Sequence, residues 1–330
     1  MEFLIEYGMF LAKAVTIVLA IIAVIIAITV ATVKPKANKG ELHLDDISEE
    51  HRDMVTDLHA QLLDKKQFKL WQKHQPEVIK ERARLFVIDF HGSVDAKETD
   101  ALREEVTAVL AIARKQDAVL VRLESGGGVV HGYGLAASQL ARIKQAGIPL
   151  TIAVDKIAAS GGYMMACIAD KIIAAPFAIV GSIGVVAQLP NFHRLLKKND
   201  IDFEQFTAGE FKRTVTLFAE NTEQGKQKFQ QELDHTHQLF KSFVAQYRPA
   251  LELDKVATGE HWFGYQALEL GLVDSLATSD EYLQSRFTDE QVLKVQYRLR
   301  KTLAERAGIA ASSFVHHTYT RLRTWSLGNQ

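Results

Sequence analysis

The stretch AVLVRLESGGG at residues 118–128 is an apolar run followed, after a glutamate, by a serine and three glycines. Two similar apolar runs flank it, RLFVIDF at residues 84–90 and PLTIAVD at residues 149–155, with helical patterns over 98–114 and 133–144 between them. Short apolar strands that alternate with helices are typical of parallel pairing, because each helix carries the chain back across the sheet. The sequence therefore predicts an α/β domain.

Glycine-rich corners follow two of these strand-like runs. One is SGGG at residues 125–128, and the other is SGG at residues 160–162, within DKIAASGGYMMACIAD. A serine beside glycine is common in ordinary turns, so Ser160 taken alone indicates only a corner of the chain. In α/β proteins, however, catalytic groups gather at the carboxyl ends of strands. This position makes Ser160 a candidate nucleophile.

The composition favours a globular protein and excludes several classes of function. The chain has 330 residues, of which 47% are hydrophobic, and a formal net charge of -1. A nucleic-acid-binding protein usually carries a marked basic excess, so we expect no nucleic-acid partner. Cys167 is the single cysteine of the sequence, which excludes an internal disulfide and a multi-cysteine metal site. We expect no metal and no cofactor.

The N-terminal part contains twenty consecutive uncharged residues, 14–33, which as a helix span about 30 Å, the thickness of the hydrocarbon core of a bilayer. A cleaved signal peptide is the alternative, but it normally has a basic start and a shorter apolar core, whereas Glu2 and Glu6 lie here. We therefore predict a single-pass anchor in the lipid bilayer. Three lysines follow the run and one precedes it, which favours a cytoplasmic position for the rest of the chain.

The sequence divides into five segments. They are an N-terminal segment (1–13), the transmembrane helix (14–33), a polar linker with a juxtamembrane amphipathic helix (34–83), the α/β domain (84–287) and a basic helical tail (288–330). Asp46, with an acidic residue three positions later, marks the start of the juxtamembrane helix, which is predicted to run to about Lys73. That helix is either a solvated spacer or a contact for a partner. Another long helix is predicted over 222–247.

Three other kinds of site fail on their spacing. A GxGxxG phosphate loop would need glycine at His131. His235 and His237 lie two residues apart on a predicted helix and point in different directions, whereas helical metal ligands lie three or four apart. The GxSxG elbow of α/β-hydrolases would need glycine at Ala158. A Ser-His-Asp triad on another fold stays open, because the order of its members varies between folds.

A lysine is the remaining candidate for activating Ser160. Lysine has an ordinary pKa of about 10.4 and acts as a general base only when it is neutral, which requires burial in an apolar site. Lys212 follows the strand-like run IDFEQF (201–206) and is flanked by Phe211 and Val215, which makes it a candidate base, although taken alone it is expected to be a surface lysine. The alternatives, Lys156 and Lys171, lie beside strand ends, where their side chains reach solvent easily.

Four segments in order carry a resemblance to a known family. They are DKIAASGGYMMA (155–166), PFAIVGSIGVV (176–186), TAGEFKR (207–213) and HWFGYQALELGLVD (261–274), and together they resemble the signal peptide peptidase A family of serine proteases. The resemblance covers essentially the whole chain. It implies the ClpP/crotonase type of fold, built of stacked ββα units, and a bacterial inner-membrane protein.

The resemblance also implies a role for individual residues. Ser160 matches the nucleophile, Lys212 the general base, and Ser182 the serine that orients this lysine. The backbone N–H groups of Gly161 and Gly127 match the oxyanion hole, which stabilises the charge on the tetrahedral intermediate. The glycines then allow the bare backbone to approach the substrate carbonyl closely.

One position departs from the family pattern, because Gly126 stands where many members have proline, and this puts the oxyanion assignment in doubt. The substrates implied are signal-peptide remnants or other membrane-associated and unfolded peptides. Family members form ring-like homo-oligomers in which neighbouring subunits shape the site. A role in clearing signal peptides favours a catalytic domain on the outer side of the inner membrane, whereas the lysines after the span favour the cytoplasmic side. Two rival functions are a crotonase-like acyl-CoA enzyme and a catalytically silent membrane scaffold.

Overall fold

The computed structural model describes residues 7–11, 13–18, 21, 40–74 and 82–298. The chain divides into two compact units, Met1–Glu41 with Leu299–Gln330, and Leu42–Arg298. In the first unit, the described residues between 7 and 21 are helical. Among the described residues, no helix has the length and apolar character needed to cross a membrane. Most of the predicted span, 14–33, lies outside them.

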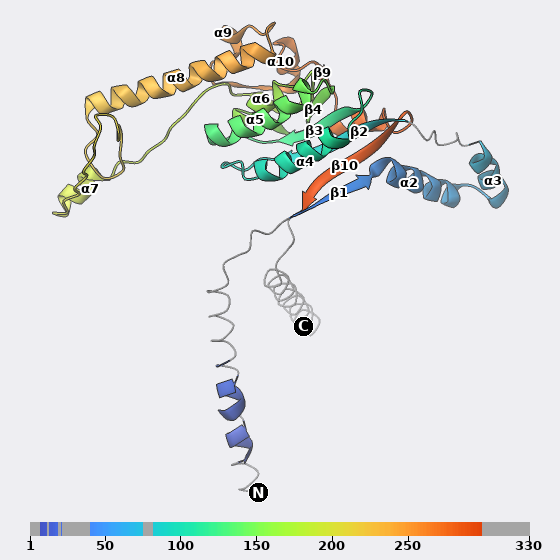
Figure 1. The fold of residues 1–330 in the computed structure, drawn as a ribbon, viewed down its shortest axis with the longest axis horizontal. Helices are drawn as coiled ribbons and strands as arrows, with labels where there is room; N and C mark the ends of the chain where they lie inside the picture. The colour runs from blue at the N-terminus through green and yellow to red at the C-terminus, as the bar shows by residue number, and fades with distance from the viewer. Residues whose placement is uncertain (1–6, 12, 19–20, 22–39, 75–81, 299–330) are drawn as a thin grey trace, which may run out of the picture. The chain divides into compact units, whose positions relative to one another are not determined.

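The second unit contains a seven-stranded sheet, which confirms the predicted α/β class (Figure 1). Its strands lie in the order β1-β10-β2-β3-β4-β6-β9. The bounds are β1 (Glu41–Asp46), β2 (Ala83–His91), β3 (Ala118–Glu124), β4 (Leu150–Val154), β6 (Lys171–Ala174), β9 (Ser275–Leu276) and β10 (Glu290–Arg298). From β10 to β9 every pair is parallel. The three strands predicted from apolar runs are β2, β3 and β4.

Helices cover both faces of this sheet. The helices described in this unit are α2 (Ile47–Leu62), α3 (Lys65–Lys73), α4 (Thr99–Ile112), α5 (Val130–Gln145), α6 (Gly161–Ala166), α7 (His193–Lys198), α8 (Glu223–Tyr247), α9 (Leu253–Val256), α10 (Gly264–Glu269) and α11 (Ser279–Gln284), of which α3 and α7 lie away from the sheet (Figure 1). Successive residues of a strand point to opposite faces. Phe86 and Ile88 accordingly pack into the larger core with α4, α5 and α6, whereas Leu85 and Val87 pack into the smaller core with α2 and α11.

A second, three-stranded sheet brings the candidate serines to one place. It contains β5 (Ile157–Ala159), β7 (Ile179–Gly181) and β8 (His261–Phe263), with β5 parallel to β7 and β7 antiparallel to β8. Ser125, which follows β3, forms an isolated parallel bridge with Ala158 of β5. The glycine corner after β3 therefore runs beside the strand that leads to Ser160.

The structure corrects three boundaries. Residues 41–46, predicted as linker, form β1, and residues 290–298, predicted as part of a helical tail, form β10. In β10, Leu293 and Val295 alternate with polar residues such as Lys294, as in a strand. Lys294 forms an ion pair with Asp89. The basic residues of this segment led to the prediction of a charged tail instead of a strand. The juxtamembrane helix does begin after Asp46, whose carboxylate accepts from the first helical N–H groups, but a second cap at Asp64 divides it into α2 and α3.

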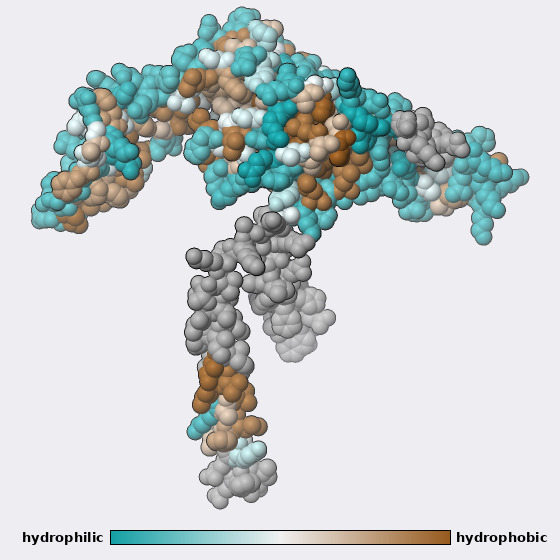
Figure 2. Space-filling view, in the orientation of Figure 1, coloured by the Kyte–Doolittle hydropathy of each residue, from teal (hydrophilic) through white to brown (hydrophobic). Residues whose placement is uncertain are grey.

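Residues 184–222, here called the arm, lead away from the sheets to the outer end of α8, and α8 itself runs back toward the sheets (Figure 1). The predicted strand at 201–206 is wrong, because these residues form no strand. The arm holds its own aromatic cluster of Phe192, Phe203 and Phe218. It also exposes much apolar surface, visible around α7 in Figure 2, from Val186, Leu189, Phe192, Leu195, Ile201, Phe203, Phe206, Phe211 and Phe218.

Candidate active site

Ser160 occupies a strained corner between β5 and α6. Its φ of 53° lies in the left-handed region, which costs a residue other than glycine about 1–3 kcal/mol and is common at functional sites. Backbone hydrogen bonds hold it there: its N–H donates to the Gly181 carbonyl at 2.8 Å, and its carbonyl accepts from the Met164 N–H at 2.9 Å. The Ser160 hydroxyl takes no part in capping α6.

Ser182 occupies the matching corner on the neighbouring strand. Ala159 and Gly181 are partners in the β5–β7 register, so Ser160 and Ser182 each follow a paired residue at the same end of two parallel strands. Ser182 also has a left-handed φ, 52°, and its N–H donates to the Glu260 carbonyl at 2.7 Å. Its hydroxyl makes only a long bond, 3.4 Å, to the Gly259 carbonyl. The structure therefore brings these two predicted site residues together.

Both predicted oxyanion glycines lie against Ser160 in surroundings that exclude a side chain. A Cβ on Gly127, whose φ is 86°, would lie 2.8 Å from the Ser160 Cβ and 2.7 Å from the Gly161 nitrogen. A Cβ on Gly161 would lie 2.4 Å from the ring of Tyr133. Gly161 is the first residue of α6, where a backbone N–H has no partner within the helix. Bare backbone therefore lies against Ser160.

Ser125 and Tyr133 support this backbone, and neither was singled out by the sequence. The Gly127 N–H donates to the Ser125 hydroxyl at 3.0 Å, so it is already engaged. Ser125 in turn is hydrogen-bonded to the hydroxyl of Tyr133. Burial raises the pKa of Tyr133 above its ordinary value, although the bond from Ser125 opposes this, so the phenol stays protonated at neutral pH. The sequence feature that could have indicated them is their position in ESGGGVVHGY (124–133), which directly follows a strand.

Lys212 lies on the arm, and its side chain is exposed. Phe211 beside it lies under Lys228 in α8, with 5.4 Å from the ammonium nitrogen to the ring centre. Further along α8, His237 contacts the carbonyl of Ile183, the residue after Ser182, at 3.1 Å. Nine residues of helix separate these contacts, which is about 14 Å. One chain therefore holds Lys212 away from the serines.

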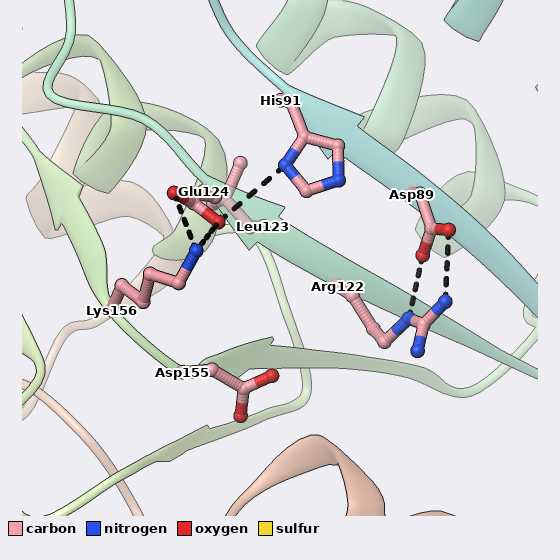
Figure 3. Close-up of a pocket in the computed structure, with 7 residues that line it drawn as sticks. All are labelled: Asp89, His91, Arg122, Leu123, Glu124, Asp155 and Lys156. Carbon is pink, nitrogen blue, oxygen red and sulfur yellow. Dashed lines mark hydrogen bonds and ion pairs between the residues drawn. The ribbon is translucent and has the colours of Figure 1, made fainter. Parts of the chain in front are cut away.

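A hollow of about 240 Å³ lies at the carboxyl ends of β2, β3 and β4 (Figure 3). It is lined by Asp89, His91, Arg122, Leu123, Glu124, Asp155 and Lys156. Burial alone would raise the pKa of Asp89, but hydrogen bonds from Arg122 and Lys294 outweigh it and hold the pKa below its ordinary value. Lys156 bonds to Glu124 at 3.0 Å and is largely exposed, as expected for a lysine at a strand end. The hollow is thus an ion-paired surface.

Comparisons with known proteins show the family to which the chain belongs. Residues 142–293 match peptidase family S49, and residues 2–140 match the N-terminal region of that family. The "Probable protease SohB" of Haemophilus influenzae is 52% identical over 326 residues, covering 93% of this chain and 92% of that protein. The "Probable protease SohB" of Buchnera aphidicola from Acyrthosiphon pisum is 59% identical over 225 residues, covering 68% and 67%.

Among solved structures, a membrane-bound stomatin-specific protease, 1510-N, in complex with a substrate peptide, matches with a TM-score of 0.42 and 15% identity. The match covers 68% of this chain and 96% of that one. The sequence relationships decide the class: this chain belongs to peptidase family S49, the signal peptide peptidase A family, and is a serine peptidase. Its curated relatives over most of the chain carry the name SohB.

Proposed function

We propose that the protein is a membrane-anchored endopeptidase that cleaves peptide bonds with a Ser-Lys dyad. The observation that carries this proposal is the Ser160 corner: a strained serine at a strand end, with its hydroxyl uncapped and the glycine backbone of Gly127 and Gly161 packed against it. A nucleophile needs an accessible hydroxyl, and an oxyanion needs N–H donors close by, here the Gly161 N–H and the Gly127 N–H that also donates to Ser125.

Lys212, in this proposal, reaches Ser160 from a neighbouring copy of the chain in a homo-oligomer. The arm supports this arrangement, because it extends from the sheets, exposes Lys212 and carries apolar side chains such as Phe206, which is 88% exposed. An exposed apolar patch on the body includes Phe177, just before β7, and Tyr265 of α10, and it offers a place for the arm of the next copy. Docking there would bury the lysine in the apolar surroundings that a neutral base requires.

The chemistry then follows in four steps. Neutral Lys212 takes the proton of the Ser160 hydroxyl while the oxygen attacks the peptide carbonyl. The charge that forms on the carbonyl oxygen is stabilised by the Gly161 N–H and by the Gly127 N–H, which Ser125 shares. The intermediate collapses to an acyl-enzyme as the amine leaves with the proton from the lysine. Water then attacks the ester, again with Lys212 as base, and releases the second product. Ser182 orients the lysine.

The proposed substrates are signal-peptide remnants and other membrane-associated or unfolded peptides. A span at 14–33 would hold the enzyme in the bacterial inner membrane, close to such substrates. The lysines after the span favour a cytoplasmic catalytic domain, and a role in clearing signal peptides favours the outer side; accessibility of the domain to protease in intact spheroplasts distinguishes the two. The two sheets and their helices are consistent with the ClpP/crotonase type of fold.

The test is covalent labelling of the detergent-solubilised full chain with a fluorophosphonate probe, followed by the mass of the labelled peptide. We expect wild type to be labelled at Ser160, and Ser160→Ala and Lys212→Ala to lose labelling. Lys198→Ala, on the same arm, is the matched control and keeps it. Labelling that survives Lys212→Ala would contradict the lysine base. A folded oligomer that is never labelled and cleaves no peptide would favour the scaffold, and acyl-CoA binding would favour the crotonase-like enzyme.

A further inference from the structure

Two buried hydroxyl groups link the glycine corner after β3 to the core below Ser160. Tyr133 is fully buried and Ser125 is 3% exposed, so their hydroxyl groups must find partners inside the protein. The Tyr133 hydroxyl donates to the Ser93 carbonyl at 2.8 Å. A carbonyl can only accept, so the single phenol proton is used there, and Ser125 donates to the phenol oxygen. The Gly127 N–H completes the chain by donating to Ser125.

Tyr133 contacts both halves of the backbone beside the nucleophile. Its hydroxyl acts on Gly127 through Ser125, and the base of its ring lies directly against the α-carbon of Gly161. The far end of the chain is anchored as well, because the Ser93 N–H donates to the Glu98 carboxylate at 3.0 Å at the start of α4. One side chain from the first turn of α5 therefore touches the supports of both predicted oxyanion donors.

We propose that Ser125 and Tyr133 are positioning residues that set the orientation of the oxyanion-binding backbone, an inference that rests on the proposed function. The hydrogen-bond chain keeps Ser125 turned toward Tyr133 and fixes the peptide plane of Gly127. Without the phenol oxygen, the other acceptor for the Ser125 hydroxyl is the Gly92 carbonyl, at 3.5 Å in the structure. If the Ser125 side chain turns toward Gly92, it no longer holds the N–H of Gly127 in place. Donors that are held in place stabilise the transition state, whereas donors that must reorganise do so less.

The experiment compares Tyr133→Phe with Tyr163→Phe in the full chain in detergent. Tyr163 is a matched control, because it is also fully buried and its hydroxyl also donates one bond, to the Leu272 carbonyl at 2.9 Å, away from the glycine corner. Three quantities are measured for each variant: the rate of fluorophosphonate labelling at Ser160, kcat and KM for a fluorogenic apolar peptide, and the melting temperature. Ser125→Ala and the double variant Ser125→Ala/Tyr133→Phe complete the set.

We expect Tyr133→Phe and Ser125→Ala each to lower kcat and the labelling rate by about tenfold or more, with KM nearly unchanged, because the lost stabilisation concerns the transition state. The double variant falls no further than the worse single variant, since both act through one chain of bonds. Tyr163→Phe lowers the melting temperature by a similar few degrees but leaves kcat within about twofold.

Equal activity losses in Tyr133→Phe and Tyr163→Phe, or wild-type kinetics in Tyr133→Phe, would overturn the inference. Additive losses in the double variant would also overturn it, because the two hydroxyl groups would then act separately. Ser125→Ala carries the same test if Tyr133→Phe does not fold. Failure of the proposed function has a different signature: wild type itself is not labelled at Ser160, or Ser160→Ala is as active as wild type.

Discussion

The two halves of the proposed dyad lie in regions that are built in opposite ways. Ser160 stands at the junction of two sheets, where the residues on either side of it, Ala159 and Gly161, are buried. Backbone hydrogen bonds to Gly181 of β7 and from Met164 of α6 hold it in an unfavourable conformation. Lys212 stands on the arm, where almost every residue between 184 and 213 is exposed or half-buried. The core thus positions the candidate nucleophile, and the arm leaves the candidate base in solvent.

This difference indicates which part of the site a single chain completes. A strained backbone persists only where the surrounding structure holds it, and the Ser160 corner has this support within one chain. A lysine becomes a base only when it is desolvated, and the arm does not desolvate Lys212. We therefore expect the platform around Ser160 to depend on the stability of the core, and the function of Lys212 to depend on association of copies.

The largest expected effect is the loss of activity when Ser160 or Lys212 is replaced, and its recovery when the two variants are mixed. Ser160→Ala and Lys212→Ala alone should each lose at least about 100-fold in kcat, as is usual for loss of a general base or nucleophile. Co-expressed as mixed oligomers, they should regain about a quarter of wild-type activity, because a heterologous contact pairs an intact serine with an intact lysine at random. The measurement is fluorophosphonate labelling of purified mixed oligomers.

A verified mixed oligomer with no recovered labelling would show that each chain supplies its own lysine. The control is a mixture in which both variants carry Ser160→Ala, which cannot regain labelling in either case. Intermediate subunit ratios sharpen the result, since recovered labelling should be greatest when the two variants are present in equal amounts.

The next effect compares a glycine of the platform with one of the arm. Gly127→Ala adds a Cβ at 2.8 Å from that of Ser160 at a φ of 86°, so we expect a loss of about 3 kcal/mol in the free energy of unfolding and loss of labelling. Gly209→Ala has a φ of 98° with nothing within 4 Å of the new atom, so strain alone costs about 1 kcal/mol. Chemical denaturation measures both, and equal losses would refute the distinction between the regions.

A smaller effect concerns the stability of the body as a function of pH. Glu105 is 6% exposed, and burial raises its pKa from 4.5 to about 7, despite the hydrogen bond from the Tyr297 N–H. A carboxyl group with a higher pKa in the folded chain favours folding while it is protonated, so its contribution falls as the pH rises from about 4.5 to about 7. Glu105→Gln should remove this loss and stabilise the protein at pH 8 by about 3 kcal/mol.

Denaturation curves at pH 5 and pH 8 measure this change, with Glu104→Gln, a more exposed neighbour on α4, as the control. The rate at which protease cuts the arm should stay the same in Glu105→Gln, because the arm is already exposed. A variant that gains no stability at pH 8 would show that Glu105 titrates at an ordinary pKa. A variant that also protects the arm would show that the two regions are coupled.

The smallest expected effect is at the hollow beneath the strand ends. Lys156 and Glu124 form an ion pair whose side chains are 71% and 36% exposed, and exposed pairs contribute little. Lys156→Met and Glu124→Gln should each change the free energy of unfolding by less than about 0.5 kcal/mol and kcat by less than about twofold. A large fall in kcat with unchanged stability would instead show that this pair positions the glycine corner and β5.

Much of the fold could be predicted because local patterns were strong. The run at residues 118–124 is purely apolar apart from Arg122 and Glu124, and it forms β3 with the predicted bounds. The long helix predicted over 222–247 is α8, which begins after a Thr222 cap. β10 was missed because a basic strand at the end of the domain resembles a charged tail. Ser125 and Tyr133 were missed because their roles depend on contacts between the β3 corner and α5.

The sequence by itself determined the class of protein, the α/β architecture and the identity of Ser160 as a candidate nucleophile, because strand periodicity, glycine corners and ordered motifs are local properties of the chain. Only the tertiary structure decided that Ser160 and Ser182 share one edge, since this depends on the pairing of β5 with β7. It also decided that Lys212 lies apart, because the length of α8 separates the arm from the sheets. Distances between segments follow from packing, which no single segment encodes.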